Sequence, residues 1–367
     1  MNEIWNAALQ FDIDGEPIYI ERYGDGHIHE TYAVYFRHAI KAPFRVILQK
    51  INSNVFRDPH KVMENITAVT SFLSDKIKTC EHNGRIEVLT VIPTKDGHSL
   101  FEDEYGNFWR SFVFIENAFC YQCAQRPVLF SNSAKAFGRF QRLLDGFSVD
   151  KLHETIPDFH NTPKRYANFT ASVEKDAAGR AKHVEREIDF IVSHEQESRI
   201  ITDLLDSDII PVRVTHSDTK LNNVLMDIRT DEAVCVIDLD TVMPGSVLYD
   251  FGDSIRFGAT LSAEDEHDMN KVEFSLPLYE EYTKGYLSEA RLTEKELEYL
   301  AWGARVITYE QAMRFLADYL DGDTYYKTNR EDQNLDRARV QIKLIEGMEK
   351  QFDQMQNIVR KYANAIV

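Results

Sequence analysis

The sequence contains little cysteine and no long hydrophobic run. Four cysteines occur in 367 residues, and only Cys120 and Cys123 are close together along the chain. One such pair without a second does not match a zinc ribbon, so we expect free thiols in a reducing compartment. No stretch of about 18 apolar residues is present, which argues against a transmembrane helix. The first residues lack the basic and apolar segments of a secretory signal, so we expect a cytoplasmic protein.

Basic residues are fewer than acidic ones. The chain has 42 lysines and arginines against 60 aspartates and glutamates, a net charge of −18. This charge repels nucleic-acid backbones and anionic lipid surfaces, so we expect neither as a partner. The hydrophobic share of 43% and the 22 phenylalanines are enough for a sizeable core. The length suggests two domains or one fold with two lobes.

Hydrophobic periodicity changes along the chain. The first third predicts one helix over 60–77, a turn at 24–26, and β-strands over 18–36, 44–51, 85–94 and 108–116. From about residue 131 the pattern predicts a β-rich patch at 212–242 and helices over 133–147, 173–206, 274–320 and 332–362. We therefore predict an α+β protein with a β-rich N-terminal lobe over 1–116 and a mostly helical C-terminal lobe over 117–367.

The most informative motif is HSDTKLNN at residues 216–223. Phosphoryl transfer needs a carboxylate that accepts the acceptor's hydroxyl proton, a metal ligand a few residues on, and often a cation that meets the phosphate. Asp218, Asn223 and Lys220 supply these three groups in one loop. The alternative is a polar turn in which Asp and Asn side chains bind the local backbone.

A second acidic segment follows twenty positions after Asp218. Residues 233–237 form an apolar run typical of a buried strand, and Asp238 and Asp240 lie at its end. The intervening residues are long enough for a hairpin that returns the chain beside the first loop. Carboxylates beside an asparagine suit Mg²⁺. The alternative is a capped strand end with solvated acids, although two acids on a buried run repel each other without a cation.

Two further motifs are less specific. Residues 250–252 read DFG, but no buried strand precedes them, so we interpret Asp250 as a structural acceptor that ties the catalytic loop. Gly24 and Gly26 would let a backbone approach phosphates closely, although a tight hairpin turn has the same composition. His27 at this loop tip would face a substrate, a phosphate or solvent.

Together these motifs resemble the aminoglycoside-phosphotransferase and choline-kinase superfamily, which has a bilobal protein-kinase-like fold. Within it, the chain is most similar to bacterial N-acetylhexosamine 1-kinases. The resemblance rests on YGDGHI, VILQKIN, FVFIEN, HSDTKLNNVL, VIDLDTVMPG, YDFGDSIRFGA and RFLADYL, which lie between residues 23 and 326. It implies ATP and Mg²⁺ as cofactors. It also implies phosphate transfer to the anomeric hydroxyl of N-acetylglucosamine or N-acetylgalactosamine.

The resemblance further implies a role for each matching residue. Asp218 is the implied base, with Lys220 beside it, and Asn223 and Asp238 are the implied metal ligands. The implied nucleotide-binding residues are Gly24, Gly26, Gln49 and the hinge residues Phe114, Ile115 and Glu116. The implied sugar-binding residues are His27, Phe257, Arg314 and Tyr325.

Arg314 also stands out without the resemblance. It interrupts an apolar helical run, where a charge needs a partner or a ligand. An arginine fork suits sugar hydroxyls and an acetamido carbonyl. The alternative is an ion pair with Asp318 four positions on. Tyr325 would stack on a sugar ring or cover the core.

Two positions depart from the patterns of the related kinases. Gln49 occupies the third-strand position where protein kinases carry a phosphate-binding lysine, and Lys50 is expected on the opposite face of the strand. A lysine–glutamate pair with Glu64 is therefore not expected. His29 stands where an asparagine is expected.

We therefore predict a kinase for a free N-acetylhexosamine. One alternative is a kinase of the same fold for another small hydroxyl compound, such as an amino alcohol, a thio-sugar or an aminoglycoside. Another is a catalytically inactive protein that binds a sugar or nucleotide. A metal hydrolase is disfavoured because only His216 lies near the acids.

Overall fold

An antiparallel sheet forms most of the N-terminal part of the computed structural model, which describes residues 2–24, 26, 28–80, 84–123 and 126–364. The strand order is β1-β2-β3-β6-β4, and β5 also pairs with β6. The strands are β1 (Glu16–Arg22), β2 (Glu30–Arg37), β3 (Phe44–Lys50), β4 (Val91–Ile92), β5 (Phe101–Glu102) and β6 (Phe108–Val113).

A helix covers each face of this sheet. On one face, Ala7 and Ala8 of α1 (Asn2–Ala8) pack with Leu48 and Trp109. On the other face, α2 (Pro59–Thr79) packs on Phe112 and also contacts the C-terminal part of the chain. Because side chains alternate along a strand, β3 and β6 each present one set of residues to α1 and another to α2.

Two small sheets follow and carry the loops of interest. β7 (Ala118–Phe119), β9 (Val224–Asp227) and β10 (Ala233–Val236) form a sheet in the order β10-β9-β7, and β8 (Arg213–Thr215) pairs with β11 (Met243–Gly245). All these pairs are antiparallel. The loop after β8 leads into β9, and the loop after β10 leads into β11. Because β8 pairs with β11 and β9 pairs with β10, the two loops lie side by side.

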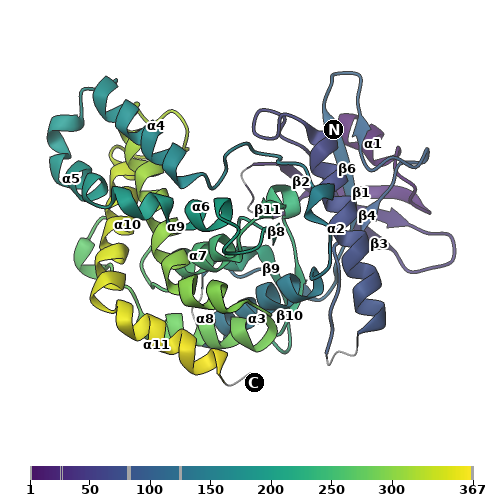
Figure 1. Cartoon of the computed structure of the whole chain (residues 1–367). Coiled ribbons are helices and arrows are strands. Elements are labelled where there is room, and N and C mark those ends of the chain that lie inside the picture. The colour runs from purple at the N-terminus through teal and green to yellow at the C-terminus, as the bar shows by residue number, and fades with distance from the viewer. Residues whose placement is uncertain (1, 25, 27, 81–83, 124–125, 365–367) are drawn as a thin grey trace.

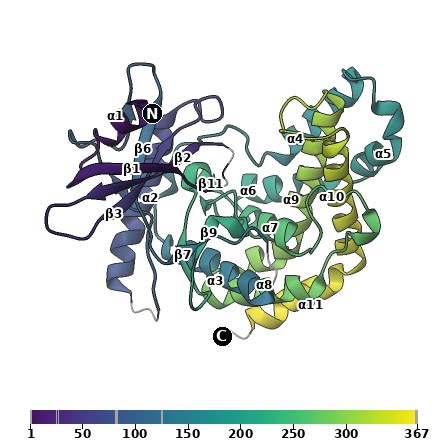
Figure 2. The ribbon, with the colours of Figure 1, turned by 180° about the vertical axis from the view of Figure 1, so that it is seen from behind.

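Helices form the rest of the chain. They are α3 (Pro127–Leu143), α4 (Thr162–Lys175), α5 (Glu185–Ser193), α6 (Ile200–Asp206), α7 (Val247–Gly258), α8 (Leu276–Glu289), α9 (Glu294–Leu320), α10 (Gln333–Lys350) and α11 (Phe352–Ala363). Figures 1 and 2 show the large sheet at one end, α4, α5 and α10 at the other, and β8, β9 and β11 between them. The predicted α+β fold with a β-rich and a helical lobe is confirmed. The boundary at 116/117 lies between β6 and β7, and we propose it as the division of the lobes.

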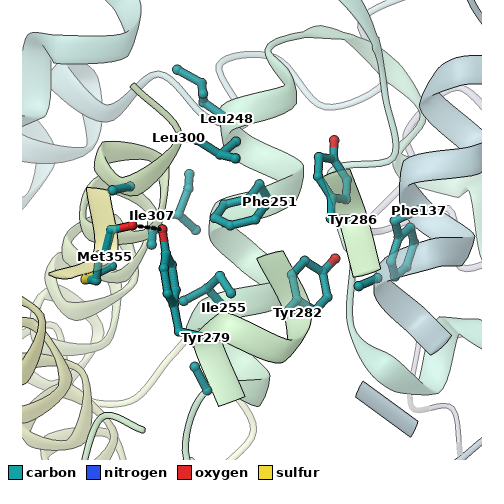
Figure 3. Close-up of a cluster of buried hydrophobic side chains, with 14 of the residues drawn as sticks. Phe137, Leu248, Phe251, Ile255, Tyr279, Tyr282, Tyr286, Leu300, Ile307 and Met355 are labelled. Carbon is teal, nitrogen blue, oxygen red and sulfur yellow. Dashed lines mark hydrogen bonds between the residues drawn. The ribbon is translucent and has the colours of Figure 1, made fainter. Parts of the chain in front are cut away.

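The core of the helical lobe explains the DFG sequence. Phe251 lies among Tyr279, Tyr282 and Tyr286 of α8, with ring centroids 5.5–6.0 Å apart (Figure 3). Gly252 allows α7 to approach α9 closely, because a Cβ there would lie 2.3 Å from the carbonyl oxygen of Gly303. The phenylalanine and glycine of this motif therefore serve helix packing.

Several predicted elements are confirmed and others are shorter. Helix 60–77 and strands 44–51 and 108–116 correspond to α2, β3 and β6, whereas the strand expected over 85–94 is reduced to β4. The helix expected over 173–206 is interrupted after α4, where Asp176 has φ 39°. The helix expected over 274–320 is divided, because Thr293 and Glu296 form a capping box that begins α9. Among the described residues, none of the helices combines the length and apolar character that crossing a bilayer requires.

Candidate active site

The loop after β8 gathers the three predicted groups. The Lys220 ammonium lies 2.7 Å from the Asp218 carboxylate. The Asn223 amide donates hydrogen bonds to the backbone carbonyl of Asp218 at 2.8 Å and to its carboxylate at 3.0 Å. About a quarter of the Asp218 side chain remains exposed, at 27%. The carboxylate is therefore both oriented and accessible to a small molecule.

Two carboxylates of α7 hold this loop from behind. Asp250 accepts hydrogen bonds from the backbone N–H groups of His216 at 2.9 Å and Ser217 at 2.8 Å. Asp253 accepts one from the N–H of Thr219 at 2.9 Å. Ser217 has φ 65°, an unfavourable conformation for a residue with a side chain. The interpretation of Asp250 as a structural acceptor is confirmed.

The second acidic segment lies against the first. The N–H of Ile237 donates to the carbonyl oxygen of Asn223 at 2.9 Å, and a ring nitrogen of His216 lies 2.9 Å from the carbonyl oxygen of Ile237. Asp238 follows with φ 61°. Its side chain is exposed. The hairpin of β9 and β10 thus brings Asp238 back beside the loop of Asp218, as the sequence predicts.

The charges in this region influence one another. Burial alone would raise the pKa of Asp218, but the Lys220 ammonium outweighs it, so the pKa lies below its usual value. The Asp218 carboxylate in turn raises the pKa of Lys220. The surrounding protein, followed by the charges of Asp240 and Asp218, raises the pKa of Asp238 to about 7. Asp218 and Lys220 are therefore ionised at neutral pH, and Asp238 is the carboxyl that a cation would stabilise most.

The available donors fit a hard divalent cation. The Asn223 amide nitrogen is engaged by Asp218, which leaves its oxygen for a metal. The Asp238 carboxylate accepts no hydrogen bond from the described residues. Two oxygen donors from the protein, with the remaining positions left to phosphate and water, are the pattern that Mg²⁺ favours.

A buried ion pair that the sequence reasoning missed lies next to these acids. Arg110 of β6 donates to both carboxylate oxygens of Asp240, at 2.7 Å each. The two side chains are only 2% and 3% exposed. Burial alone would raise the pKa of Asp240, but Arg110 and His29 outweigh it and hold the pKa below its usual value. The sequence signal that could have revealed this pair is Arg110 itself, a charged residue between Trp109 and Phe112 in a predicted strand.

The neighbours of Gln49 explain how the sheet accommodates this residue in place of a lysine. Its oxygen accepts a hydrogen bond from Arg110 Nε at 2.9 Å, and its nitrogen donates to the Thr31 hydroxyl at 2.9 Å. Lys50 points to the opposite face, as expected, where it pairs with Glu3 of α1 at 2.8 Å. Glu64 pairs with His153 at 2.5 Å. The nucleotide-binding role of Gln49 stays a prediction.

The hinge and the glycine loop lie beside each other. The Tyr23 ring packs edge-on against Phe114, with centroids 5.2 Å apart. Arg45 lies over Phe114 at 3.7 Å and forms a bidentate pair with Glu116. These contacts place the predicted hinge residues next to the turn that contains Gly24.

Several predicted contacts of this loop remain predictions. Gly24 has φ 77°, a conformation that favours glycine, and a Cβ at Gly24 or Gly26 would meet no atom within 4 Å. Ile115 is buried with the strand that begins at Ala233. His27, predicted to contact the sugar, lies outside the described residues.

Arg314 lies in an aromatic cage. Its guanidinium lies 5.8 Å from the Phe159 ring, 6.0 Å from Tyr325 and 5.7 Å from Tyr326. No carboxylate in the described part of the chain forms an ion pair with it. The alternative pairing with Asp318 is wrong, because Asp318 instead accepts from the backbone N–H groups of Thr324, Tyr325 and Tyr326 at 2.7–2.9 Å. Asp318 thereby shapes the turn that presents the two tyrosines.

Phe257 lines a cavity beside the loop of Asp218. The cavity has a volume of about 270 Å³, and Leu221, Arg256 and Gln341 are among its other lining residues. Arg256, which lines this cavity, pairs with two carboxylates. Arg256 lies 2.9 Å from Asp253 and 2.7 Å from Glu264.

A comparison with family models identifies the class of protein. A model described as the phosphotransferase enzyme family matches residues 98–294, more than half of the chain. The chain therefore belongs to this family. The matched region contains the loop of Asp218, the hairpin of Asp238, and α7.

Solved structures of small-molecule kinases share the fold. A microcompartment-associated aminopropanol kinase is 15% identical, with a TM-score of 0.59 over 97% of this chain and 98% of that one. An amicoumacin kinase in complex with AMP-PNP and Ca²⁺ is 13% identical, with a TM-score of 0.57 over 93% and 91%. A spectinomycin phosphotransferase in complex with ADP and its antibiotic is 14% identical, with a TM-score of 0.53 over 98% and 97%. At these identities the likeness shows the fold alone.

Proposed function

We propose that the protein transfers the γ-phosphate of ATP to the anomeric hydroxyl of a free N-acetylhexosamine, giving the sugar 1-phosphate. The observation that carries the proposal is the convergence of Asp218, Asn223 and Asp238, with Lys220 2.7 Å from Asp218. Phosphoryl transfer requires this combination of a base, oxygen ligands and a cation, with little covalent work by the protein.

Each residue has a distinct task in this proposal. Asp218 accepts the proton of the anomeric hydroxyl as the sugar oxygen bonds to phosphorus and the bond to the ADP oxygen breaks. Lys220 meets the negative charge that develops during transfer. Asn223 and Asp238 would hold Mg²⁺, which when bound neutralises phosphate charge. Gly24, Gly26, Gln49 and the hinge from Phe114 to Glu116 would position the nucleotide.

The charge of the Arg314 cage supports a neutral acceptor. Arg314 forms no ion pair with a carboxylate of the described residues. Its charge acts on Arg165 nearby, and the charge of Glu310 acts on both arginines. A protonated amine would be repelled here, whereas an acetamido carbonyl would accept hydrogen bonds from the guanidinium. Tyr325, which is 71% exposed, is free to stack on a sugar ring. This observation disfavours the amino-alcohol and aminoglycoside alternatives.

Phosphorus NMR on parallel reactions tests the proposal. Wild-type protein, ATP and Mg²⁺ are incubated separately with N-acetylglucosamine, N-acetylgalactosamine, glucose and ethanolamine. An anomeric phosphate signal with an N-acetylhexosamine and none with ethanolamine is the expected result. Phosphorylation of ethanolamine alone would contradict the acceptor assignment, and nucleotide binding without any product would favour the inactive binding protein.

A further inference from the structure

Arg110 and Gln49 project from the same face of the large sheet. They are register partners in the antiparallel pair of β3 and β6, and partners across such a pair lie on one face. Phe112, two residues further along β6, packs with α2 on this face. The face that has no lysine at position 49 therefore still carries a buried cation, but β6 supplies it.

Arg110 connects the sheet to the segment that bears Asp238. Its Nε donates to Gln49 at 2.9 Å, while its two terminal nitrogens bind Asp240 at 2.7 Å each. Gln49 is fixed in turn by Thr31 of β2 at 2.9 Å. Three strands of the N-terminal lobe thus hold a carboxylate of the C-terminal lobe through one guanidinium. The planar fork of arginine matches a carboxylate in this bidentate geometry.

The ion pair gives the two neighbouring acids different environments. Asp240 is 3% exposed and fully engaged. Asp238 is exposed, has φ 61°, and accepts no hydrogen bond from the described residues. A backbone in this conformation needs support from its surroundings. Leu239 is the one residue between the two acids, so the position of Asp240 limits where Asp238 can lie.

His29 of the N-terminal lobe lies beside the same carboxylate. Its Nδ1 accepts a hydrogen bond from the backbone N–H of Asn52 at 3.1 Å, which leaves the ring hydrogen on Nε2. Nε2 lies 3.3 Å from an oxygen of Asp240, and the ring stacks on Phe56. Arg110 binds Asp240 and His29 lies beside it, so this carboxylate is at the junction of the lobes.

We propose that Arg110 is a positioning residue for phosphoryl transfer. It supplies the cation that β3 lacks and holds Asp240, and it thereby fixes Asp238 for the metal–nucleotide complex. This inference rests on the proposed kinase function. A purely structural ion pair between the lobes is the competing explanation. It predicts that removing both charges together leaves nucleotide binding intact, because replacing a whole buried pair is often neutral for stability.

The test compares variants by affinity for Mn²⁺ with AMP-PNP, measured by calorimetry, and by kcat and KM. Arg110→Met alone leaves the buried Asp240 carboxylate without its bidentate partner, with only His29 beside it, and is expected to destabilise the fold. The decisive variant is therefore Arg110→Met with Asp240→Asn. We expect it to remain folded, to bind Mn²⁺ with AMP-PNP at least tenfold more weakly, and to lose kcat. Arg37→Met, which removes the exposed pair between Arg37 of β2 and Glu16 of β1, is the matched control.

A variant that moves the cation from β6 to β3 distinguishes the effect of its charge from the effect of its packing. Gln49→Lys combined with Arg110→Met places the cation on β3 and is expected to recover most of the affinity. Failure to recover it would overturn the claim that the cation matters. A double Arg110→Met, Asp240→Asn variant with wild-type affinity and kcat would overturn the inference while leaving the proposed function intact. Wild-type protein that binds no Mn²⁺ with AMP-PNP would overturn both.

Discussion

Replacing Asp250 by asparagine tests how the catalytic loop is held. The carboxylate accepts from the backbone of His216 and Ser217 and from the Gln141 amide at 3.1 Å. Hydrogen bonds to a charged acceptor contribute about 1.5–3 kcal/mol each. Asparagine keeps one oxygen and turns the other into a donor, so at least one of these N–H groups loses its acceptor and faces a second donor. We expect a loss of unfolding free energy of about 2–4 kcal/mol.

The same substitution should also lower turnover, because it displaces Asp218. Ser217, with φ 65°, precedes Asp218 directly, so the loop relaxes when its tie is lost. A displacement of the reacting groups of about 1 Å lowers turnover on the order of 100-fold. Urea unfolding and steady-state kinetics measure both effects, with KM for ATP expected to change little. Asp75→Asn on α2, which is exposed, is the control. Wild-type stability and kcat in Asp250→Asn would show that this carboxylate does not hold the loop.

Three other predictions concern the site itself. Asp218→Asn should lower kcat by at least about 100-fold while calorimetry finds AMP-PNP affinity unchanged, and wild-type turnover would rule out Asp218 as the base. Arg314→Met should raise KM for the acceptor by about tenfold or more with KM for ATP unchanged, and an equal rise in both would place Arg314 elsewhere. Because the pKa of Asp238 is raised to about 7, protons compete with the metal below that pH. Calorimetry should therefore find binding of Mg²⁺ with AMP-PNP about tenfold weaker at pH 6 than at pH 8, and a flat profile would contradict this.

Local patterns predicted the β-rich lobe and the two acidic segments well. Periodicity identified β3, β6 and α2 because each buries one regular face. The spacing between Asp218 and Asp238 was informative because a short hairpin connects them, so closeness in sequence becomes closeness in space. The division at Thr293 was also readable, since Thr293 and Glu296 have the spacing of a capping box.

Long-range pairings could not be predicted in this way. Arg110 and Asp240 are 130 positions apart, and nothing in β6 alone indicates which carboxylate it meets. Asp318 looked like a partner for Arg314 by helical spacing, but it binds the turn beyond α9 instead. The interruption at Asp176 depends on a single left-handed residue within a segment of helical composition. Helical spacing and composition do not encode these contacts.

A crystal structure with Mn²⁺ and AMP-PNP would locate the metal site through the anomalous signal of the ion. We expect an ion bound by oxygens of Asn223 and Asp238 at about 2.2 Å, with the γ-phosphate facing Asp218 and Lys220. An ion at another acidic group, such as the cluster of His194, Glu197 and Glu349, with none between Asn223 and Asp238, would mean that these two residues do not form the metal site.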